Sequence, residues 1–206
     1  MHNQQFSFKT IQETATGSYK EKGSRFLAFA FPVQSEVETR EKLEEIKKKY
    51  FDARHHCFAW MLGPDKQKFR AFDDGEPNHS AGDPILGQIR SHDLTNILIV
   101  VVRYFGGVKL GVGGLIAAYR AAAADALQKA EIITENITME VAIEYDYTIT
   151  SEVMRLVKEF ELKILEQSHR EKGRLKAIVR LSGKDDLLEK LELMQAKGMA
   201  IDFNIA

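Results

Sequence analysis

The chain has 206 residues, of which 44% are hydrophobic, and a formal net charge of -1. This length usually holds one or two domains, and a near-neutral chain can contact nucleic acid only through a local basic patch. The single cysteine, Cys57, excludes an internal disulfide and a cysteine-cluster metal site. No apolar stretch approaches the roughly 20 residues of a membrane span, and the polar N-terminus lacks a secretory signal pattern. We therefore expect a cytoplasmic protein with no membrane contact.

The first half of the chain alternates apolar runs typical of strands with one highly charged helix. Ser35 is placed to cap that helix, and Glu38 completes a capping box three residues later. Cys57 lies in an apolar run, which favours a buried thiol over a nucleophile. The expected strands are residues 23–33, 54–62, 69–72 and 97–105, and the expected helices are residues 35–50 and 85–92.

The second half begins with an Ala-rich helix, expected from about residue 115 to 130, and residues 131–136 form a short boundary. Beyond it, strands and helices alternate as β-α-β-β-α-β, which is the ferredoxin-like pattern. The sequence therefore predicts an α+β protein. Its N-terminal domain spans residues 1–134 and its ferredoxin-like C-terminal domain residues 135–206.

A glycine loop, residues 105–114, joins the most apolar strand to the Ala-rich helix. Glycine permits positive φ and close backbone approach, and a helix N-terminus carries partial positive charge, so this layout can hold a phosphate group. The basic residues Arg103, Lys109 and Arg120 flank the loop, and Lys20, Lys22 and Arg25 could extend the basic surface. The candidate phosphate-binding or nucleic-acid-binding residues are Arg103, Gly106, Gly107, Lys109, Gly111, Gly113, Gly114 and Arg120.

The glycine loop matches neither of the common nucleotide-binding motifs. A Walker A loop needs Ser or Thr after its lysine, but Lys109 is followed by Leu110. A dinucleotide fingerprint needs a third glycine where Ile116 stands. Either the loop binds an anion or its glycines only form a tight turn and let the helix pack on the sheet. No cofactor is predicted.

An acidic loop, residues 73–84, is the second candidate for chemistry. Asp73, Asp74 and Glu76 place three carboxylates within four residues, which could hold Mg²⁺ or act as acid and base. They could instead cap backbone N–H groups and pair with an arginine. The spacing matches no EF-hand, no GxSxG motif is present, and no metal site is predicted. A possible pocket comprises Arg54, His56, Asp73, Asp74, Glu76, His79 and Ser80.

Several motifs, in this order along the chain, resemble the YigZ/IMPACT family. They are residues 22–26 (KGSRF), 53–57 (ARHHC), 73–77 (DDGEP), 81–82 (AG) and 103–120 (RYFGGVKLGVGGLIAAYR). The resemblance implies an N-terminal domain with the β-α-β topology of ribosomal proteins and of domain IV of elongation factor G. It also implies a C-terminal domain similar to domain V of that factor. Both point to contact with RNA or the ribosome, and eukaryotic members regulate translation.

The chain departs from the family pattern at His79, where the family usually has a glycine. Our leading hypothesis is a non-catalytic, translation-linked factor that binds RNA or a ribosomal surface. A second hypothesis is an enzyme for a phosphorylated small molecule, which would use both loops. A third is a module that binds a protein partner.

Overall fold

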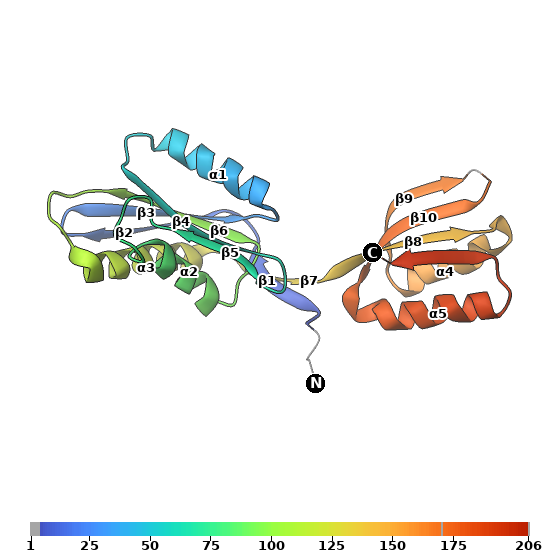
Figure 1. Cartoon of the computed structure of the whole chain (residues 1–206). Coiled ribbons are helices and arrows are strands. Elements are labelled where there is room, and N and C mark those ends of the chain that lie inside the picture. The colour runs from blue at the N-terminus through green and yellow to red at the C-terminus, as the bar shows by residue number, and fades with distance from the viewer. Residues whose placement is uncertain (1–4, 170, 206) are drawn as a thin grey trace. The chain divides into compact units, whose positions relative to one another are not determined.

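The computed structural model describes residues 5–169 and 171–205, which form two compact units (Figure 1). The N-terminal unit is Phe8–Glu135, and the C-terminal unit contains residues 136–205 together with residues 5–7. The fold class is mixed α and β with antiparallel sheets, so the predicted α+β class is confirmed. None of the helices in the described part of the chain is both long and apolar enough to cross a membrane.

The N-terminal unit is built on a five-stranded sheet in the order β2-β3-β6-β4-β5. Every neighbouring pair of strands in it is antiparallel. The strands are β2 (Ala15–Glu21), β3 (Ser24–Pro32), β6 (Ile97–Tyr104), β4 (His55–Leu62) and β5 (Lys68–Phe72). Two further strands, β1 (Ser7–Ile11) and β7 (Ile132–Asn136), pair in a separate two-stranded sheet.

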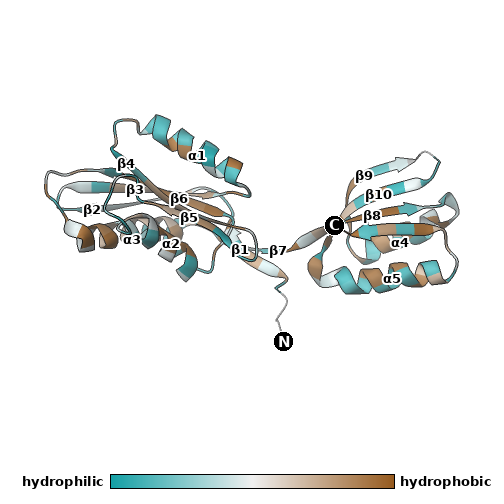
Figure 2. Ribbon diagram, in the orientation of Figure 1, coloured by the Kyte–Doolittle hydropathy of each residue, from teal (hydrophilic) through white to brown (hydrophobic). Residues whose placement is uncertain are grey.

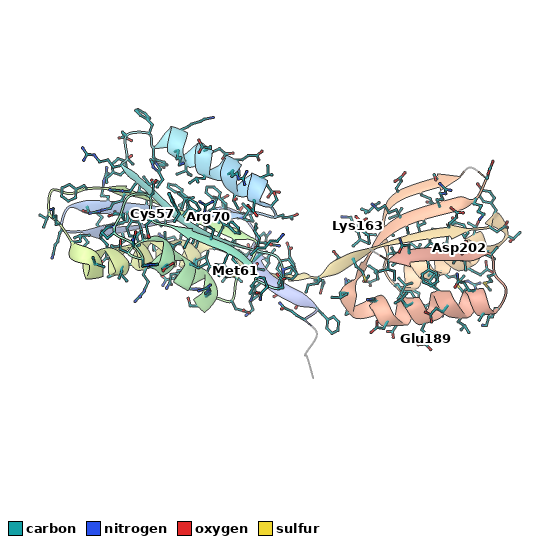
Figure 3. The ribbon with its side chains drawn as sticks, in the orientation of Figure 1. Cys57, Met61, Arg70, Lys163, Glu189 and Asp202 are labelled. Carbon is teal, nitrogen blue, oxygen red and sulfur yellow. The ribbon has the colours of Figure 1, made fainter. Side chains whose placement is uncertain are left out.

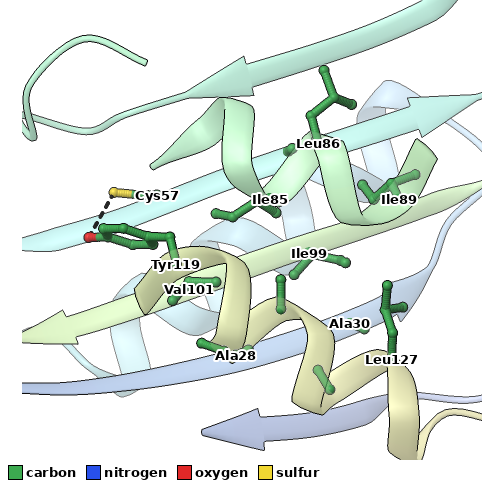
Figure 4. Packing of buried hydrophobic residues seen from close by; sticks show 14 of the residues in the cluster. Ala28, Ala30, Cys57, Ile85, Leu86, Ile89, Ile99, Val101, Tyr119 and Leu127 are labelled. Atoms are coloured by element: carbon green, nitrogen blue, oxygen red, sulfur yellow. Dashed lines mark hydrogen bonds between the residues drawn. The ribbon is translucent and has the colours of Figure 1, made fainter. Parts of the chain in front are cut away.

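Helices cover both faces of the five-stranded sheet: α1 (Glu36–Lys49) lies on one face, and α2 (Gly82–Ser91) and α3 (Gly111–Lys129) lie on the other (Figure 1). The central strand β6 is therefore buried on both faces, and it is apolar through most of its length (Figure 2). Two separate cores result. Phe29, Trp60 and Val100 belong to the core under α1, whereas Ile85 and Tyr119 belong to the core under α2 and α3 (Figure 4).

Ser35 caps the first helix as predicted, but the return bond from Glu38 goes to Gln34 and not to the Ser35 N–H of a capping box. The Ser35 hydroxyl accepts a hydrogen bond from the Glu38 backbone N–H at 3.2 Å, and the Glu38 carboxylate accepts one from the Gln34 N–H at 2.9 Å. These contacts satisfy N–H groups that have no partner within the helix.

Three expectations for the N-terminal unit need correction. Strands β1 and β2 precede the first predicted strand, so a β-α-β unit is only part of this domain. Helix α3 begins at Gly111 rather than near residue 115, which places three of the five glycines in its first turn. Helix α2 begins at Gly82 rather than at residue 85, because the Asp73 carboxylate accepts hydrogen bonds from the N–H groups at its start.

The C-terminal unit has a four-stranded antiparallel sheet in the order β11-β8-β10-β9. Its core joins the sheet to α4 and α5 through residues such as Val141, Val153 and Leu187. The connectivity is the predicted β-α-β-β-α-β. The elements are β8 (Thr138–Tyr145), α4 (Thr150–Glu159), β9 (Lys163–His169), β10 (Gly173–Arg180), α5 (Lys184–Ala196) and β11 (Ile201–Ile205), with short 3-10 turns at Tyr147–Ile149 and Leu181–Gly183.

Candidate functional site

Four loops leave the five-stranded sheet of the N-terminal unit at the same end, which we call the loop end. They are the β2–β3 turn (residues 22–23), the α1–β4 connection (residues 50–54), the acidic loop and the glycine loop. Strand pairing requires this arrangement, because Arg25 lies opposite Tyr104 and His55 lies opposite Arg103. The fold therefore brings together both loops that the sequence singled out.

The acidic loop directs its first carboxylate inward. Asp73 accepts hydrogen bonds from the backbone N–H groups of Ala81 and Gly82, at 3.0 and 2.8 Å, and from that of His79 at 2.8 Å. The N–H groups of Ala81 and Gly82 lie at the start of α2, where the helix dipole favours a negative charge. Asp73 therefore occupies the anion site of α2 from within the chain.

Asp74 fixes the same loop to strand β4. It has a φ of 42°, and its carboxylate accepts a hydrogen bond from the His56 backbone N–H at 2.7 Å. The Asp74 carbonyl oxygen lies 2.9 Å from Nδ1 of His55. The His56 ring lies between two loops, with Nδ1 3.8 Å from the Asp74 carboxylate and Nε2 3.0 Å from the Tyr50 carbonyl oxygen.

Glu76 forms a buried ion pair with Arg103, with 2.6 Å between Oε1 and Nη1, and the two side chains are 4% and 8% exposed. The Tyr119 hydroxyl donates a hydrogen bond to the same carboxylate oxygen at 2.8 Å. The Arg103 guanidinium also lies over the ring of Phe26, which meets Tyr119 edge to face. A charge this deeply buried is tolerated only when it is paired, so this contact fixes the acidic loop to β6 and α3.

Cys57 lies near the start of β4 (Figure 3), fully buried beside this network. Its sulfur is 3.3 Å from the Tyr119 hydroxyl (Figure 4) and 2.9 Å from the Asp73 carbonyl oxygen. Burial raises the pKa of the Cys57 thiol well above its usual range, and burial also raises the pKa of the Tyr119 hydroxyl. Since the thiolate is the reactive form, Cys57 is suited to packing and not to nucleophilic attack.

The glycine loop is fixed at its start and open beyond it. A Cβ on Gly106 would lie 1.9 Å from the Gly23 carbonyl carbon, so this position requires glycine for close packing on the β2–β3 turn. The Gly106 N–H also donates a hydrogen bond to the buried Ser24 hydroxyl at 3.1 Å. A Cβ on Gly107, Gly111 or Gly113 would meet nothing within 4 Å.

The side chains at the loop end differ in exposure. Arg103 is turned inward, whereas Lys109 and Arg120 are exposed, as are Lys22 and Arg25 of the neighbouring hairpin. Arg120 lies nine residues beyond Gly111, about two and a half helical turns along α3. The exposed basic side chains at the loop end include those of Lys22, Arg25, Arg54 and Lys109.

The other residues of the predicted pocket do not converge on one cavity. The Ser80 side chain is buried and its hydroxyl donates a hydrogen bond to the Pro77 carbonyl oxygen at 2.6 Å. The His79 side chain is 81% exposed, and its Nδ1 lies 2.7 Å from the Asp83 carboxylate. Arg54 is exposed at the start of β4. Within the described residues, no three histidine, cysteine or carboxylate side chains are grouped as metal ligands.

Surface hollows occur away from the loop end. One lies on the C-terminal unit and is lined by Glu144, Lys172, Arg174 and Asp202 among others. Another lies beside Gln34 and Pro64 in the N-terminal unit.

Sequence reasoning missed two groups at the loop end. It did not assign a role to the Tyr119 hydroxyl, because the Ala-rich helix around it showed only an apolar face. It also did not use the exposed phenylalanines Phe51 and Phe105, which are 83% and 56% exposed. The one available signal was position: Phe51 directly follows the expected helix of residues 35–50, and Phe105 is the last residue of the expected strand of residues 97–105, next to the glycine loop.

Comparison with known proteins identifies the family. Residues 22–127 match the family model of the Impact N-terminal domain. The chain is 32% identical to IMPACT family member YvyE of Bacillus subtilis, covering 78% of this chain and 74% of that protein. It is also 32% identical to IMPACT family member YigZ of Escherichia coli, covering 72% and 74%.

The chain is also similar to a eukaryotic protein, over a shorter stretch, and to a solved structure. The protein IMPACT homolog of Saccharomyces cerevisiae is 35% identical over 48% of this chain and 39% of its own length. A crystal structure of a hypothetical protein superposes with a TM-score of 0.76 at 27% identity, covering 97% of both chains. The chain belongs to the IMPACT family.

Proposed function

We propose that this protein is a non-catalytic factor that binds RNA, or an RNA surface of the ribosome, through the loop end. The observation that carries the proposal is the difference in exposure between the charges there. Lys22, Arg25, Arg54 and Lys109 are exposed, whereas the Glu76 side chain is 4% exposed and paired, Asp73 and Asp74 are partly buried, and the exposed carboxylates are those of Asp52 and Asp83. The loop end can therefore present positive charge to phosphate although the whole chain has a net charge of -1.

The exposed glycines support the same proposal. Gly113 has no positive φ, and a Cβ there would meet no atom within 4 Å, so the fold does not require glycine at this position. Glycine in a helix is less stable than alanine by roughly 0.5–1 kcal/mol. A ligand that approaches the backbone N–H groups at the start of α3 would account for a glycine there.

The acidic loop favours this binding role over the enzymatic alternative. Asp73 and Asp74 accept hydrogen bonds from backbone N–H groups, and Glu76 is paired with Arg103. Carboxylates held in this way order the loop and keep Arg103 in place. No observation favours a metal or an acid–base pair in the acidic loop.

The proposal also includes a link to translation and a cytoplasmic location. It includes a likeness of the N-terminal unit to domain IV of elongation factor G, and of the C-terminal unit to its domain V, with a ferredoxin-like fold for the C-terminal unit. The β-α-β-β-α-β connectivity of the C-terminal unit supports the last of these.

Cosedimentation with ribosomes at low salt tests the proposal. Lys109→Glu should reduce the bound fraction, because it reverses a charge at the proposed phosphate contact. Lys68→Glu makes the same charge change on an exposed residue of the same unit, opposite Leu62 and away from the loop end, and should have no effect. If both variants cosediment as the wild type does, the loop end does not contact the ribosome.

A further inference from the structure

Two phenylalanines at the loop end are exposed to an extent that folding does not explain. Phe51 is 83% exposed and Phe105 is 56% exposed. Neither belongs to the buried clusters of the unit. Exposed aromatic rings beside cations are the recurrent means by which proteins bind unpaired nucleic-acid bases.

Phe105 is held in position from one side. The Arg103 guanidinium carbon lies 5.6 Å from the centre of its ring, and Arg103 is itself fixed by the buried pair with Glu76. The next residue, Gly106, packs against Gly23 and donates a hydrogen bond to Ser24. On the other side, Tyr104 pairs with Arg25 in the sheet, so the backbone is fixed at both neighbours of Phe105 and little freedom is lost when a planar ligand stacks on the ring.

Phe51 is connected to the same surface through its neighbour. The Tyr104 hydroxyl donates a hydrogen bond to the Asp52 carboxylate at 2.8 Å, which joins the α1–β4 connection to the end of β6. The Arg25 guanidinium carbon lies 5.2 Å from the centre of the Tyr104 ring. One cation thus lies beside the link between the segments that carry Phe51 and Phe105.

We propose that the loop end is a stacking surface for single-stranded RNA. Phe105, and with it Phe51, contacts the faces of unpaired bases, while Lys22, Arg25 and Lys109 contact the phosphates. An RNA duplex keeps its base faces stacked internally, so it can use the cations but not the rings. This inference rests on the proposed function and specifies the ligand of the same site.

The test compares a 12-nucleotide single-stranded RNA with an RNA duplex of equal length, by fluorescence anisotropy on the whole protein. Phe105→Leu keeps apolar bulk but removes the aromatic face, and it should weaken single-strand binding about fivefold to a hundredfold while leaving duplex binding unchanged. Phe69→Leu is the matched control, because Phe69 is also 48% exposed beside an arginine, Arg90, but lies on β5. It should bind as the wild type does.

A direct readout of stacking is available because the chain has a single tryptophan, Trp60, which is only 8% exposed. Phe105→Trp adds an exposed tryptophan, whose fluorescence should be quenched by the single strand with affinity retained. If Phe105→Leu and Phe69→Leu bind the single strand alike and the fluorescence of Phe105→Trp is not quenched, the stacking proposal is wrong. In that case, salt-sensitive binding that Lys109→Glu weakens would still support the proposed function. If neither RNA binds the wild type, both proposals fail.

Discussion

Glu76 of the acidic loop and Arg103 at the end of β6 form a buried ion pair, with 2.6 Å between the carboxylate oxygen Oε1 and the guanidinium nitrogen Nη1. The pair joins two segments that are 27 residues apart in the sequence. It couples the acidic loop to the strand that leads into the glycine loop.

Glu76→Gln should destabilise the protein strongly, because it leaves the Arg103 charge buried without a counter-charge. We expect a loss of about 3–5 kcal/mol in the free energy of unfolding, measured by urea denaturation. Tyr119→Phe keeps the ion pair and removes the hydrogen bonds of the Tyr119 hydroxyl to Glu76 and from the Cys57 thiol, so it should lose about 1–2 kcal/mol. Equal losses for the two variants would show that the buried Arg103 charge does not need the Glu76 carboxylate for stability.

Gly106→Ala and Gly113→Ala should have opposite effects on stability. The first places a Cβ 1.9 Å from the backbone of Gly23, so we expect a clear fall in melting temperature. The second places a Cβ in open space on a helix and should raise stability by about 0.5–1 kcal/mol. If Gly113→Ala lowers stability instead, this glycine has a structural role and its support for ligand binding is lost.

His79→Gly should be at least as stable as the wild type. His79 has a φ of 65°, and a left-handed backbone costs about 1–2 kcal/mol in residues other than glycine. The extra freedom of glycine in the unfolded chain offsets part of that gain, by about 0.4–1 kcal/mol. His79→Val, with a β-branched side chain, should be less stable than both, and thermal melts of the three proteins would check the order.

The buried thiol of Cys57 predicts a loss of stability at high pH. Burial raises its pKa above the ordinary value of 9.0, so the folded protein keeps its proton where the unfolded chain has lost it. This contribution is complete below pH 9 and decreases above it, at up to about 1.4 kcal/mol per pH unit. The wild type should therefore lose stability between pH 9 and 10 more steeply than Cys57→Ala. Parallel pH profiles would contradict this.

Much of this fold could be predicted from the sequence where local signals were strong. The apolar run of β6 and the capping of the first helix by Ser35 are examples. Strand β2 was missed because its inward positions include Gly17, where a Cβ would lie 2.2 Å from the Ala126 backbone nitrogen on α3. A glycine there resembles a turn signal in the sequence, and only the tertiary packing explains it.

The candidate site was predictable in composition but not in arrangement. The sequence marked both loops and allowed that the acidic loop pairs with an arginine. It could not identify Arg103 as that partner, because the pairing depends on the register of β4 against β6, which places His55 opposite Arg103. The exposure of Phe105 likewise depends on where the loop leaves the sheet.

The most direct test of the central claim is the affinity of the whole protein for a single-stranded RNA, measured over a series of salt concentrations. If the loop end binds phosphate, the affinity falls with salt, and Lys109→Ala should reduce the slope of log affinity against log salt by about 0.7, the value for one phosphate contact. Lys68→Ala should leave the slope unchanged. No binding at low salt, or equal slopes for the wild type and Lys109→Ala, would contradict a phosphate-binding role for the glycine loop.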